Sequence, residues 1–370
     1  MKIFILTGHF YPEIHPRAFR ASELAKEFSR KGHDVNVCIL RTINGFDYEN
    51  YEKVNNIKIQ HINIYSQPIY KIIKKKSRSN LFFKINRFLI EYLFAGSLFY
   101  NSIRIKNRIF FPNDIDLVIS LSTPFMNHLA IAIKKRKSNH KTIYVADSGD
   151  PFYRSQQTKR APYFFYIEKC IYKKFDYLSI PMHEAKDAYR SLIHNEKIKI
   201  IPQGFDIDKI KISKNVENEF IKFAYAGVFY SDIRNPKFLF EFLTKINIPF
   251  QFEIYLRYEE NEINKLLNKY LLILGDKLKV HYAIDREELL FRLSKCDFLI
   301  NIENKTTTQL PSKLIDYAIT KRPIFSCNAL NFNPNVFNMF LTKNYSNSLE
   351  IDLEKYNIKC IAEEFISLVK

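Results

Sequence analysis

Short apolar runs alternate with segments of helical period along the whole chain. The apolar run at 2–7 predicts a buried strand, and apolar positions at helical spacing predict a helix over 17–31. Gly32 is placed to end this helix, because glycine adopts the left-handed conformation of a helix C-cap at the lowest steric cost. The run at 35–40 is the next predicted strand. A strand, a helix and a second strand in about 40 residues form a βαβ unit, which implies a parallel sheet.

The same alternation continues in two series. The first series adds strands at 57–64, 115–121, 142–147 and 197–201, and helices at 124–137, 162–175 and 183–194. The second series has strands at 222–227, 250–256, 278–282, 297–302 and 323–326, and helices at 236–246, 259–272, 285–294 and 311–320. Pro202, Gly204 and a charged segment interrupt the pattern between them.

We therefore predict an α/β protein of two Rossmann-like domains. The expected domains are 1–203 and 204–353, and a C-terminal helix in 354–370 is expected to pack back on the first domain. In such sheets ligands bind outside the carboxyl ends of the strands. Two domains that face each other across a cleft would suit a reaction that joins two different substrates.

Composition agrees with two folded domains in 370 residues. Apolar residues make up 46%, which excludes a disordered chain, and only eight glycines exclude a collagen-like one. The five cysteines form no CxxC pair, which argues against a disulfide framework or a zinc cluster and favours a reducing, cytoplasmic compartment. The sequence shows no signal peptide and no run of 18 apolar residues. We expect a cytoplasmic protein, either soluble or attached to the inner face of a membrane.

Glycines follow several predicted strands. Gly8, Gly149, Gly204 and Gly227 stand where a backbone amide would approach a phosphate, although a simple turn also explains each. The motifs GxGxxG and GxxxxGK[ST] are absent from the sequence, which argues against nicotinamide and P-loop sites.

The richest segment is 297–325, where a strand runs into a polar loop and then a helix. Pro311 suits the first helical position, and Ser312 and Lys313 follow in the first turn. Amides of a helix N-terminus together with Lys313 would bind a diphosphate, and Asp316 would accept hydrogen bonds from ribose hydroxyls. A capped helix with solvated charges is the alternative.

PSKLIDYAITKRPI (311–324) resembles the donor-site signature of retaining family 4 glycosyltransferases of the GT-B fold. Further stretches resemble motifs of that family in the right order, namely 7–37, VADSGDP (145–151), 166–181, IIPQGFD (200–206) and 222–243. The resemblance implies a nucleotide-sugar donor, here a UDP-sugar, and a glycan or lipid-linked acceptor in capsule or lipopolysaccharide O-antigen synthesis. It also implies that neither a cofactor nor a metal is required.

The resemblance also implies roles for individual residues. The residues assigned to the donor are Gly227, Arg234, Arg257, Gln309, Ser312, Lys313 and Asp316. Among them Arg234 and Lys313 would be catalytic, because they would stabilise charge on the leaving diphosphate. The residues assigned to the acceptor side are His9, Arg17, Arg20, Asp147 and Asp150, and the two aspartates would orient the acceptor hydroxyl as catalytic groups.

The sequence departs from the family pattern in places. Thr308 stands where the family's E-x7-E pair has its first glutamate, and Asp316 keeps the second carboxylate. His15 and Pro16 replace a Gly-Gly pair in the first loop. Two rivals therefore remain: a non-hydrolysing UDP-sugar epimerase, and a non-catalytic protein that binds sugar or nucleic acid.

A basic and aromatic stretch follows the first βαβ unit. Residues 53–90 contain nine Lys and Arg and no Asp or Glu, and aromatic residues gather towards position 94. This pattern predicts contact with an anionic membrane surface through 71–94, at roughly 1 kcal/mol for each basic residue near the surface. A solvated loop followed by a core helix is the alternative. We expect no nucleic-acid partner, because no RRM, helix-turn-helix or zinc motif accompanies the charge.

Overall fold

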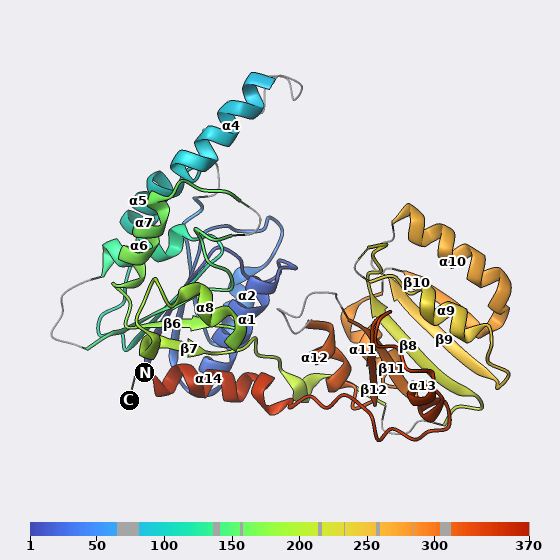
Figure 1. The fold of residues 1–370 in the computed structure, drawn as a ribbon. Coiled ribbons are helices and arrows are strands. Elements are labelled where there is room, and N and C mark those ends of the chain that lie inside the picture. Colours follow the sequence, from blue (N-terminus) through green and yellow to red (C-terminus); the bar gives the residue numbers. More distant parts are fainter. Residues whose placement is uncertain are drawn as a thin grey trace. The chain divides into compact units, whose positions relative to one another are not determined.

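The computed structural model describes residues 1–64, 81–135, 141–155, 158–213, 217–232, 234–256, 260–282, 284–303 and 312–369 (Figure 1). The chain forms two compact units, Met1–Phe205 together with Lys355–Lys370, and Asp206–Glu354. The boundaries fall at 205 and 354, against the expected 203 and 353.

The first unit is built on a parallel sheet of seven strands in the order β3-β2-β1-β4-β5-β6-β7. Its strands are β1 (Lys2–Thr7), β2 (Asp34–Ile39), β3 (Lys58–His61), β4 (Leu117–Leu121), β5 (Ile143–Asp147), β6 (Tyr177–Ile180) and β7 (Ile198–Ile200). Apolar clusters cover both faces of this sheet. That is why the central strands read as unbroken apolar runs in the sequence.

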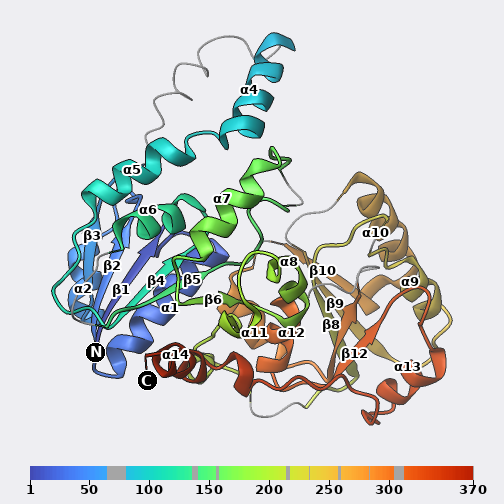
Figure 2. The same cartoon turned by 60° about the vertical axis from the view of Figure 1, so that its left-hand side comes forward.

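Helices lie on both faces of this sheet (Figure 2). The helices of this unit are α1 (Pro16–Arg30), α2 (Tyr48–Asn55), α4 (Leu81–Phe94), α5 (Leu98–Arg108), α6 (Met126–Lys134), α7 (Tyr163–Tyr172), α8 (Lys186–Tyr189) and α14 (Ile358–Ser367), and α4 extends away from the sheet. The predicted helix 183–194 is wrong in extent, because a 3-10 turn at His183–Ala185 precedes the four residues of α8.

Helix α14 returns the chain to the first unit. Its Phe365 meets Phe28 of α1 edge to face at 6.4 Å, inside a shared apolar cluster. A Cβ atom on Gly204 would lie 2.5 Å from Cδ1 of Ile358, so the strand-to-linker segment passes directly over α14. The first unit therefore contains residues from both sides of the second.

The second unit has five parallel strands in the order β10-β9-β8-β11-β12. The strands are β8 (Ile221–Gly227), β9 (Phe250–Leu256), β10 (Leu278–Tyr282), β11 (Phe298–Ile302) and β12 (Ile324–Cys327). The helices are α9 (Lys237–Leu243), α10 (Asn261–Leu274), α11 (Arg286–Leu293), α12 (Ser312–Ile319) and α13 (Pro334–Leu341). Stacked phenylalanines fill one face, with Phe223 and Phe298 only 4.8 Å apart between ring centres.

Both sheets share the Rossmann strand order. In each, the first strand lies between the second and the fourth, so the connection changes direction beside β1 and beside β8. Ligands of such sheets bind outside the carboxyl ends of the strands at this point. The prediction of an α/β fold with two Rossmann-like domains is confirmed. None of the helices in the described ranges combines the length and the apolar content needed to cross a bilayer.

Candidate active site

In the first unit, the turn after β1 packs against the turn after β4. A Cβ atom on Gly8 would lie 2.2 Å from Cδ of Pro124 and 3.0 Å from the carbonyl oxygen of Thr123. A side chain at position 8 would push these two turns apart. The close contact with Pro124 therefore explains why position 8 is a glycine, and no phosphate contact is needed to explain it.

Asp147, at the carboxyl end of β5, lies in a buried ion pair with Arg20. The Nε atom of Arg20 donates to both carboxylate oxygens at 2.9 Å, and Ser179 Oγ donates to Oδ2 at 2.9 Å. Arg17 Nη1 donates to Oδ1 at 2.8 Å. Burial alone would raise the pKa of Asp147, but the two guanidinium groups hold it below its usual range.

The burial of Arg20 and Asp147 argues against the expectation that these two residues contact an acceptor directly. Arg20 also donates to the carbonyl of Ile201 at 3.0 Å, and Asp147 is only 1% exposed. Both residues direct their polar atoms into the unit and join α1 to the sheet. Asp147 also holds Arg17 through Oδ1, and both Arg20 and Asp147 lie too deep to contact a ligand directly.

Arg17 lies across the backbone of Gly149. A Cβ atom on Gly149 would lie 1.9 Å from Nη2 of Arg17, so the glycine makes room for the guanidinium group. Burial lowers the pKa of Arg17, although Asp147 counteracts this effect. Asp150 follows one residue later and is exposed. A cation and an exposed carboxylate thus stand together at the carboxyl end of β5.

A series of hydrogen-bonded, buried polar side chains supports the loop after β5, and none of the predicted roles involved them. His128 of α6 contacts Ser120 Oγ through Nδ1 at 2.8 Å and Ser148 Oγ through Nε2 at 3.0 Å. Ser148 Oγ lies 2.8 Å from the hydroxyl of Tyr172. Burial lowers the pKa of His128 to about 3, so the imidazole is neutral at physiological pH. Ser148 lies within the VADSGDP motif (145–151), whereas no sequence motif includes His128.

Glu168 fixes the other side of the same loop. Its carboxylate accepts hydrogen bonds from the backbone amides of Phe152 and Tyr153, both at 2.8 Å. Burial raises the pKa of Glu168. The segment that carries Asp150 is therefore held at Ser148 on one side and at Phe152 on the other.

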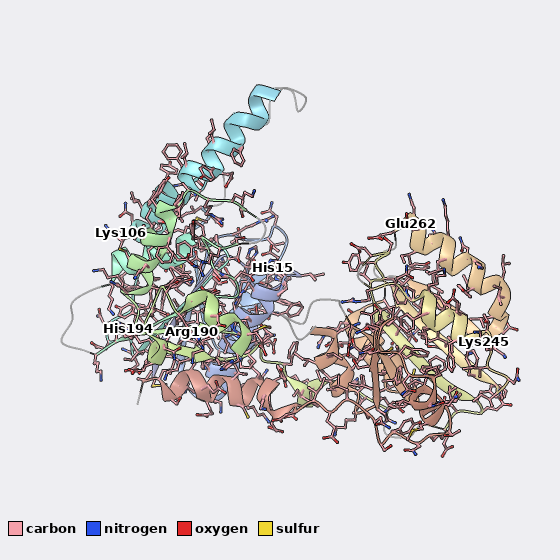
Figure 3. All side chains as sticks on the ribbon, in the orientation of Figure 1. His15, Lys106, Arg190, His194, Lys245 and Glu262 are labelled. Atoms are coloured by element: carbon pink, nitrogen blue, oxygen red, sulfur yellow. The ribbon has the colours of Figure 1, made fainter. Side chains whose placement is uncertain are left out.

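His9 lies beside His15, the residue that precedes α1 (His15 is labelled in Figure 3). Its ring stacks on His15 with centres 4.0 Å apart, and its Nδ1 lies 2.9 Å from a carboxylate oxygen of Glu13. The backbone amide of Arg17 donates to Nδ1 of His15 at 3.2 Å, so His15 caps the helix just before Pro16. Burial and the neighbouring His9 lower the pKa of His15. The residues that replace the family's Gly-Gly pair thus place Arg17 in the first turn of α1.

In the second unit, Lys313 and Gly227 meet at the carboxyl end of β8. Gly227 has φ +143°, a backbone conformation that L-residues rarely adopt, and its Cβ would lie 3.8 Å from Cδ of Lys313. The Nζ atom of Lys313 donates to the carbonyl of Ile302 at 3.3 Å and lies 4.7 Å from the ring centre of Tyr225. Tyr317 of α12 bonds through its hydroxyl to both backbone groups of Ala226, at 2.7 and 3.1 Å, and so ties this helix to β8.

Arg234 places a second basic side chain at the carboxyl end of β8. Its Nη1 donates to the carbonyl of Val228 at 3.2 Å, one residue after Gly227. Burial lowers the pKa of Lys313 well below its usual range, and the charge of Arg234 lowers it further. Two basic side chains are therefore held close together where β8 ends.

Asp316 lies one helical turn after Lys313 and pairs with Arg286 of α11. Nε and Nη2 of Arg286 approach Oδ1 of Asp316 at 3.1 and 2.6 Å. Burial raises the pKa of Asp316, while Arg286 opposes that rise. Arg286 lies outside the sequence motifs of the donor site, because only the fold brings α11 against α12.

Some predicted site residues are not described. Arg257, Thr308 and Gln309 lie outside the described residues, and Ser312 is described only as the first residue of α12. Among the residues that are described, no three His, Cys, Asp or Glu side chains form a group that could hold a metal ion.

The sequence model of Glycosyltransferase Family 4 matches residues 19–209. The chain belongs to this family. The matched range includes Arg20, Asp147 and the loop that carries Asp150. No curated protein matches this family member in sequence.

Solved structures resemble this family 4 glycosyltransferase over its whole length. A glycosyltransferase from Rickettsia africae ESF-5 gives a TM-score of 0.60 at 11% identity, covering 100% of this chain and 97% of its own. The lipopolysaccharide outer core galactosyltransferase WaaB in its apo form gives 0.56 at 14%, covering 100% and 99%. Alr3699/HepE from Anabaena, in complex with UDP-glucose, gives 0.55 at 14%, covering 100% and 99%. The likeness confirms the GT-B fold.

Proposed function

We propose that this family 4 glycosyltransferase moves a sugar from a UDP-sugar to a glycan or lipid-linked acceptor, with retention of anomeric configuration. The pathway we propose is bacterial capsule or O-antigen synthesis. The observation that carries the proposal is the pair of cations, Lys313 and Arg234, beside Gly227 at the end of β8.

This pair suits a diphosphate. Burial of the Lys313 ammonium and the nearby charge of Arg234 disfavour the charged form of Lys313 in the unliganded site, as the depressed pKa of Lys313 indicates. Lys313 forms no ion pair within the described residues, so an anionic ligand would neutralise a charge that the protein leaves uncompensated. The N-terminal amides of α12 add partial positive charge at the same place.

Asp316 suits the ribose of the same donor. It lies three residues after Lys313, and residues at this spacing share one face of a helix. Arg286 donates both hydrogen bonds to Oδ1, and Oδ2 has no partner in the part of the chain that is described. Oδ2 is therefore available to accept a hydroxyl. The complex of Anabaena Alr3699/HepE with UDP-glucose supports a uridine nucleotide as the donor class.

The chemistry then follows from charge. When the bond between the anomeric carbon and the diphosphate breaks, negative charge grows on the leaving oxygen, and Lys313 and Arg234 stabilise it. The acceptor oxygen bonds to the anomeric carbon on the face that the diphosphate leaves, and its proton passes to the departing phosphate. The protein contributes positioning, with Asp150 and Arg17 on the acceptor side and His9 beside them. No metal or cofactor takes part in this proposal.

The membrane contact through 71–94 belongs to the same proposal. Residues 71–80 lie outside the described part of the chain. In α4, Phe88, Leu89, Leu93 and Phe94 are exposed, although they are large apolar side chains. Such residues next to a basic stretch support attachment to an anionic bilayer, where a lipid-linked acceptor would lie.

A thermal-shift screen with UDP, GDP, CMP and dTDP tests the donor class first. A ligand at 100 times its dissociation constant adds about 2.7 kcal/mol to stability. We expect stabilisation by UDP and UDP-sugars in the native chain and a loss of that shift in Lys313→Ala. Transfer assays then separate the rivals, because an epimerase converts the UDP-sugar without an acceptor and a binding protein releases it unchanged. Absence of any nucleotide shift would contradict the proposal.

A further inference from the structure

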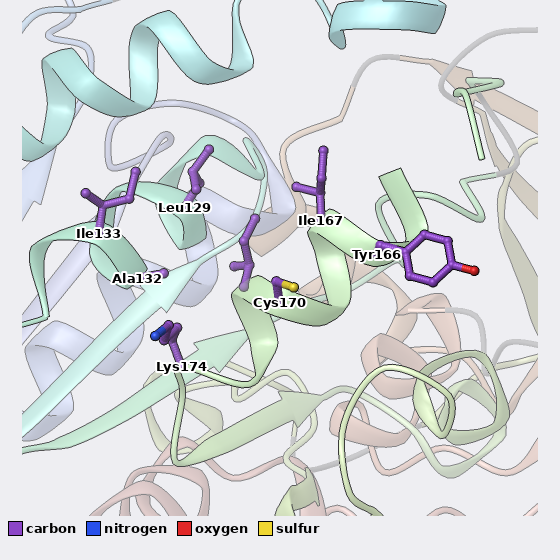
Figure 4. A pocket seen from close by; sticks show the side chains of 8 residues that line it. Leu129, Ala132, Ile133, Tyr166, Ile167, Cys170 and Lys174 are labelled. Carbon is purple, nitrogen blue, oxygen red and sulfur yellow. The ribbon is translucent and has the colours of Figure 1, made fainter. Parts of the chain in front are cut away.

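An apolar groove runs between α6 and α7 on the first unit (Figure 4). Its volume is about 360 Å³, within the range of ligand pockets. The residues that line it are Leu129, Ala132, Ile133, Tyr166, Ile167, Cys170, Ile171 and Lys174. Lys174 is the only charged member of this set, and it lies at one end, away from Tyr166 (Figure 4).

The groove opens within a larger apolar layer. α5 joins α6 through Ser102, whose hydroxyl donates to the carbonyl of Met126 at 3.2 Å. α5 joins α7 through Phe99 and Phe164, whose rings stack at 6.4 Å. α4 joins the start of α7 through the backbone amide of Ala161, which donates to the carbonyl of Tyr92 at 2.9 Å. Large apolar side chains are exposed on α4, α5, α6 and α7: Phe88, Leu89, Leu93, Phe94, Phe99, Tyr100, Ile103, Ile133, Tyr163 and Tyr166. A gathering of this kind marks an interaction site rather than ordinary surface.

Apart from the buried Glu168, the charged residues of α5, α6 and α7 are all basic. α5 and α6 contain no acidic residue, and the one acid of α7, Glu168, is fully buried. The basic residues of these helices and of the two positions after α7 are Arg104, Lys106, Arg108, Lys134, Lys169, Lys173 and Lys174 (Lys106 is labelled in Figure 3). The nearby acid Asp176 is paired with Lys135 at 3.2 Å. The Nζ atom of Lys174 has no hydrogen bond or ion pair to any residue that the structure describes.

We propose that the α6–α7 groove takes one acyl chain of an anionic phospholipid from the bilayer, with the phosphate of its headgroup at Lys174. An apolar slot with a cation at one end is complementary to such a molecule, which is apolar along its chain and anionic at its end. The site rests on the membrane contact proposed for 71–94 but uses different residues, and it does not depend on sugar transfer.

Two cysteines of the chain allow a direct test. Cys170 lines the groove and is exposed, and Cys360 is exposed on α14, while Cys38, Cys296 and Cys327 are buried. The rate of maleimide alkylation at each position is measured by mass spectrometry on the full chain. The probe is myristoyl lysophosphatidylglycerol below its micelle concentration. Myristoyl lysophosphatidylcholine tests the headgroup charge, and glycerol phosphate tests the headgroup alone.

We expect the anionic single-chain lipid to slow alkylation of Cys170 about tenfold at ten times its dissociation constant, since about one molecule in eleven then stays free. Cys360 should keep its rate. Lysophosphatidylcholine should protect Cys170 more weakly, and glycerol phosphate should not protect it. Equal protection of both cysteines, or protection of neither, would overturn the proposal. Protection of Cys170 that rises with protein concentration alone would assign the groove to a second copy of the chain instead.

Matched charge reversals sharpen the result. Lys174→Glu should remove most of the protection by the anionic lipid, whereas Lys173→Glu, one residue away and outside the lining set, should retain it. Equal effects of the two variants would overturn the role of Lys174. Donor binding in the thermal-shift screen and vesicle sedimentation through 71–94 are read separately, so failure of the groove and failure of the proposed function are distinguishable.

Discussion

Arg286 donates two hydrogen bonds to a single oxygen of Asp316, at 3.1 and 2.6 Å, and leaves the second oxygen without a partner among the described residues. The two residues come from adjacent helices, α11 and α12, that begin 26 positions apart at 286 and 312. The pair therefore fixes the direction of the Asp316 carboxylate in the ligand-free protein, and Arg286 favours its charged form. Such a carboxylate binds a hydroxyl without first losing rotational freedom.

Arg286→Ala should weaken donor binding more at low pH than at high pH. Burial raises the pKa of Asp316 and Arg286 opposes this, so loss of Arg286 lets the carboxyl protonate at higher pH. We expect about a tenfold loss of UDP affinity, or about 1.4 kcal/mol, at the acidic end of a pH series, and a smaller loss at its basic end. Calorimetric titration at several pH values measures it. Arg292→Ala removes an exposed arginine of the same helix and is the matched control; equal effects would refute the positioning role.

Lys313→Ala should lower the transfer rate by about 100- to 1000-fold, the range seen when one charge-stabilising donor is removed. The melting temperature should not fall, because the depressed pKa of Lys313 means that its buried charge is unfavourable in the folded protein without ligand. Steady-state kinetics and thermal melting of the same sample check both statements. Lys279→Ala, at an exposed position of β10, should leave both unchanged. A Lys313→Ala variant with native transfer rate would refute the donor site.

Gly149→Ala should reduce activity by displacing Arg17. The added Cβ would stand 1.9 Å from Nη2 of Arg17, a distance at which the guanidinium group must move. Overpacking of this kind costs about 1–3 kcal/mol of stability. A double-mutant cycle with Arg17→Ala isolates the cause, because the glycine substitution should cost little once Arg17 is absent. Additive effects of the two substitutions would show that Gly149 acts independently of Arg17.

His128 should make the first unit less stable in acid. Its pKa is about 3 in the folded unit against an ordinary value of 6.5, so the unfolded chain binds the proton first. Its stabilising effect is complete above about pH 6.5 and is lost as the pH falls from there towards 3, at about 1.4 kcal/mol per pH unit. Urea unfolding followed by circular dichroism at pH 7.5, 6 and 5 measures the slope. His128→Gln should flatten it, and the exposed His183→Gln should not.

Reversal of Lys74, Lys75 and Lys76 to glutamate should weaken binding to vesicles of anionic lipid. Each basic residue near the surface contributes about 1 kcal/mol, and screening by salt should reduce the native affinity as well. Sedimentation with vesicles at two salt concentrations checks this. The exposed lysines 265, 269 and 279 of the second unit provide a reversal of equal charge as the control. Unchanged sedimentation of the first variant would refute contact through 71–94.

The strands were predictable because burial on both faces turns each one into an apolar run. β9 and β10 coincide with their predicted ranges of 250–256 and 278–282. β6 was missed: Tyr177–Ile180 has only four residues and follows α7 after a short turn, so the run merges with the helical pattern. α13 was also missed, although Asn333 caps it and Pro334 begins it.

The sequence allowed candidate site residues to be named, but it did not predict their contacts. Motif resemblance led to Lys313, Arg234 and Asp316, since each lies in a short stretch of recognisable order. It gave no sign that Asp147 is buried against Arg20, because these residues are 127 positions apart and only the pairing of β1, β4 and β5 brings them together. Contacts of this kind depend on the tertiary fold, and local spacing does not encode them.

The return of α14 to α1 has a consequence for synthesis on the ribosome. Domains usually fold in the order in which they emerge, with the N-terminal one first. Here Phe28 packs against Phe365, and the whole of 206–354 is synthesised before Phe365. The second unit can therefore complete its core while the first unit still exposes the apolar face of α1 that α14 later covers. A chaperone would be expected to bind this exposed face of the nascent first unit.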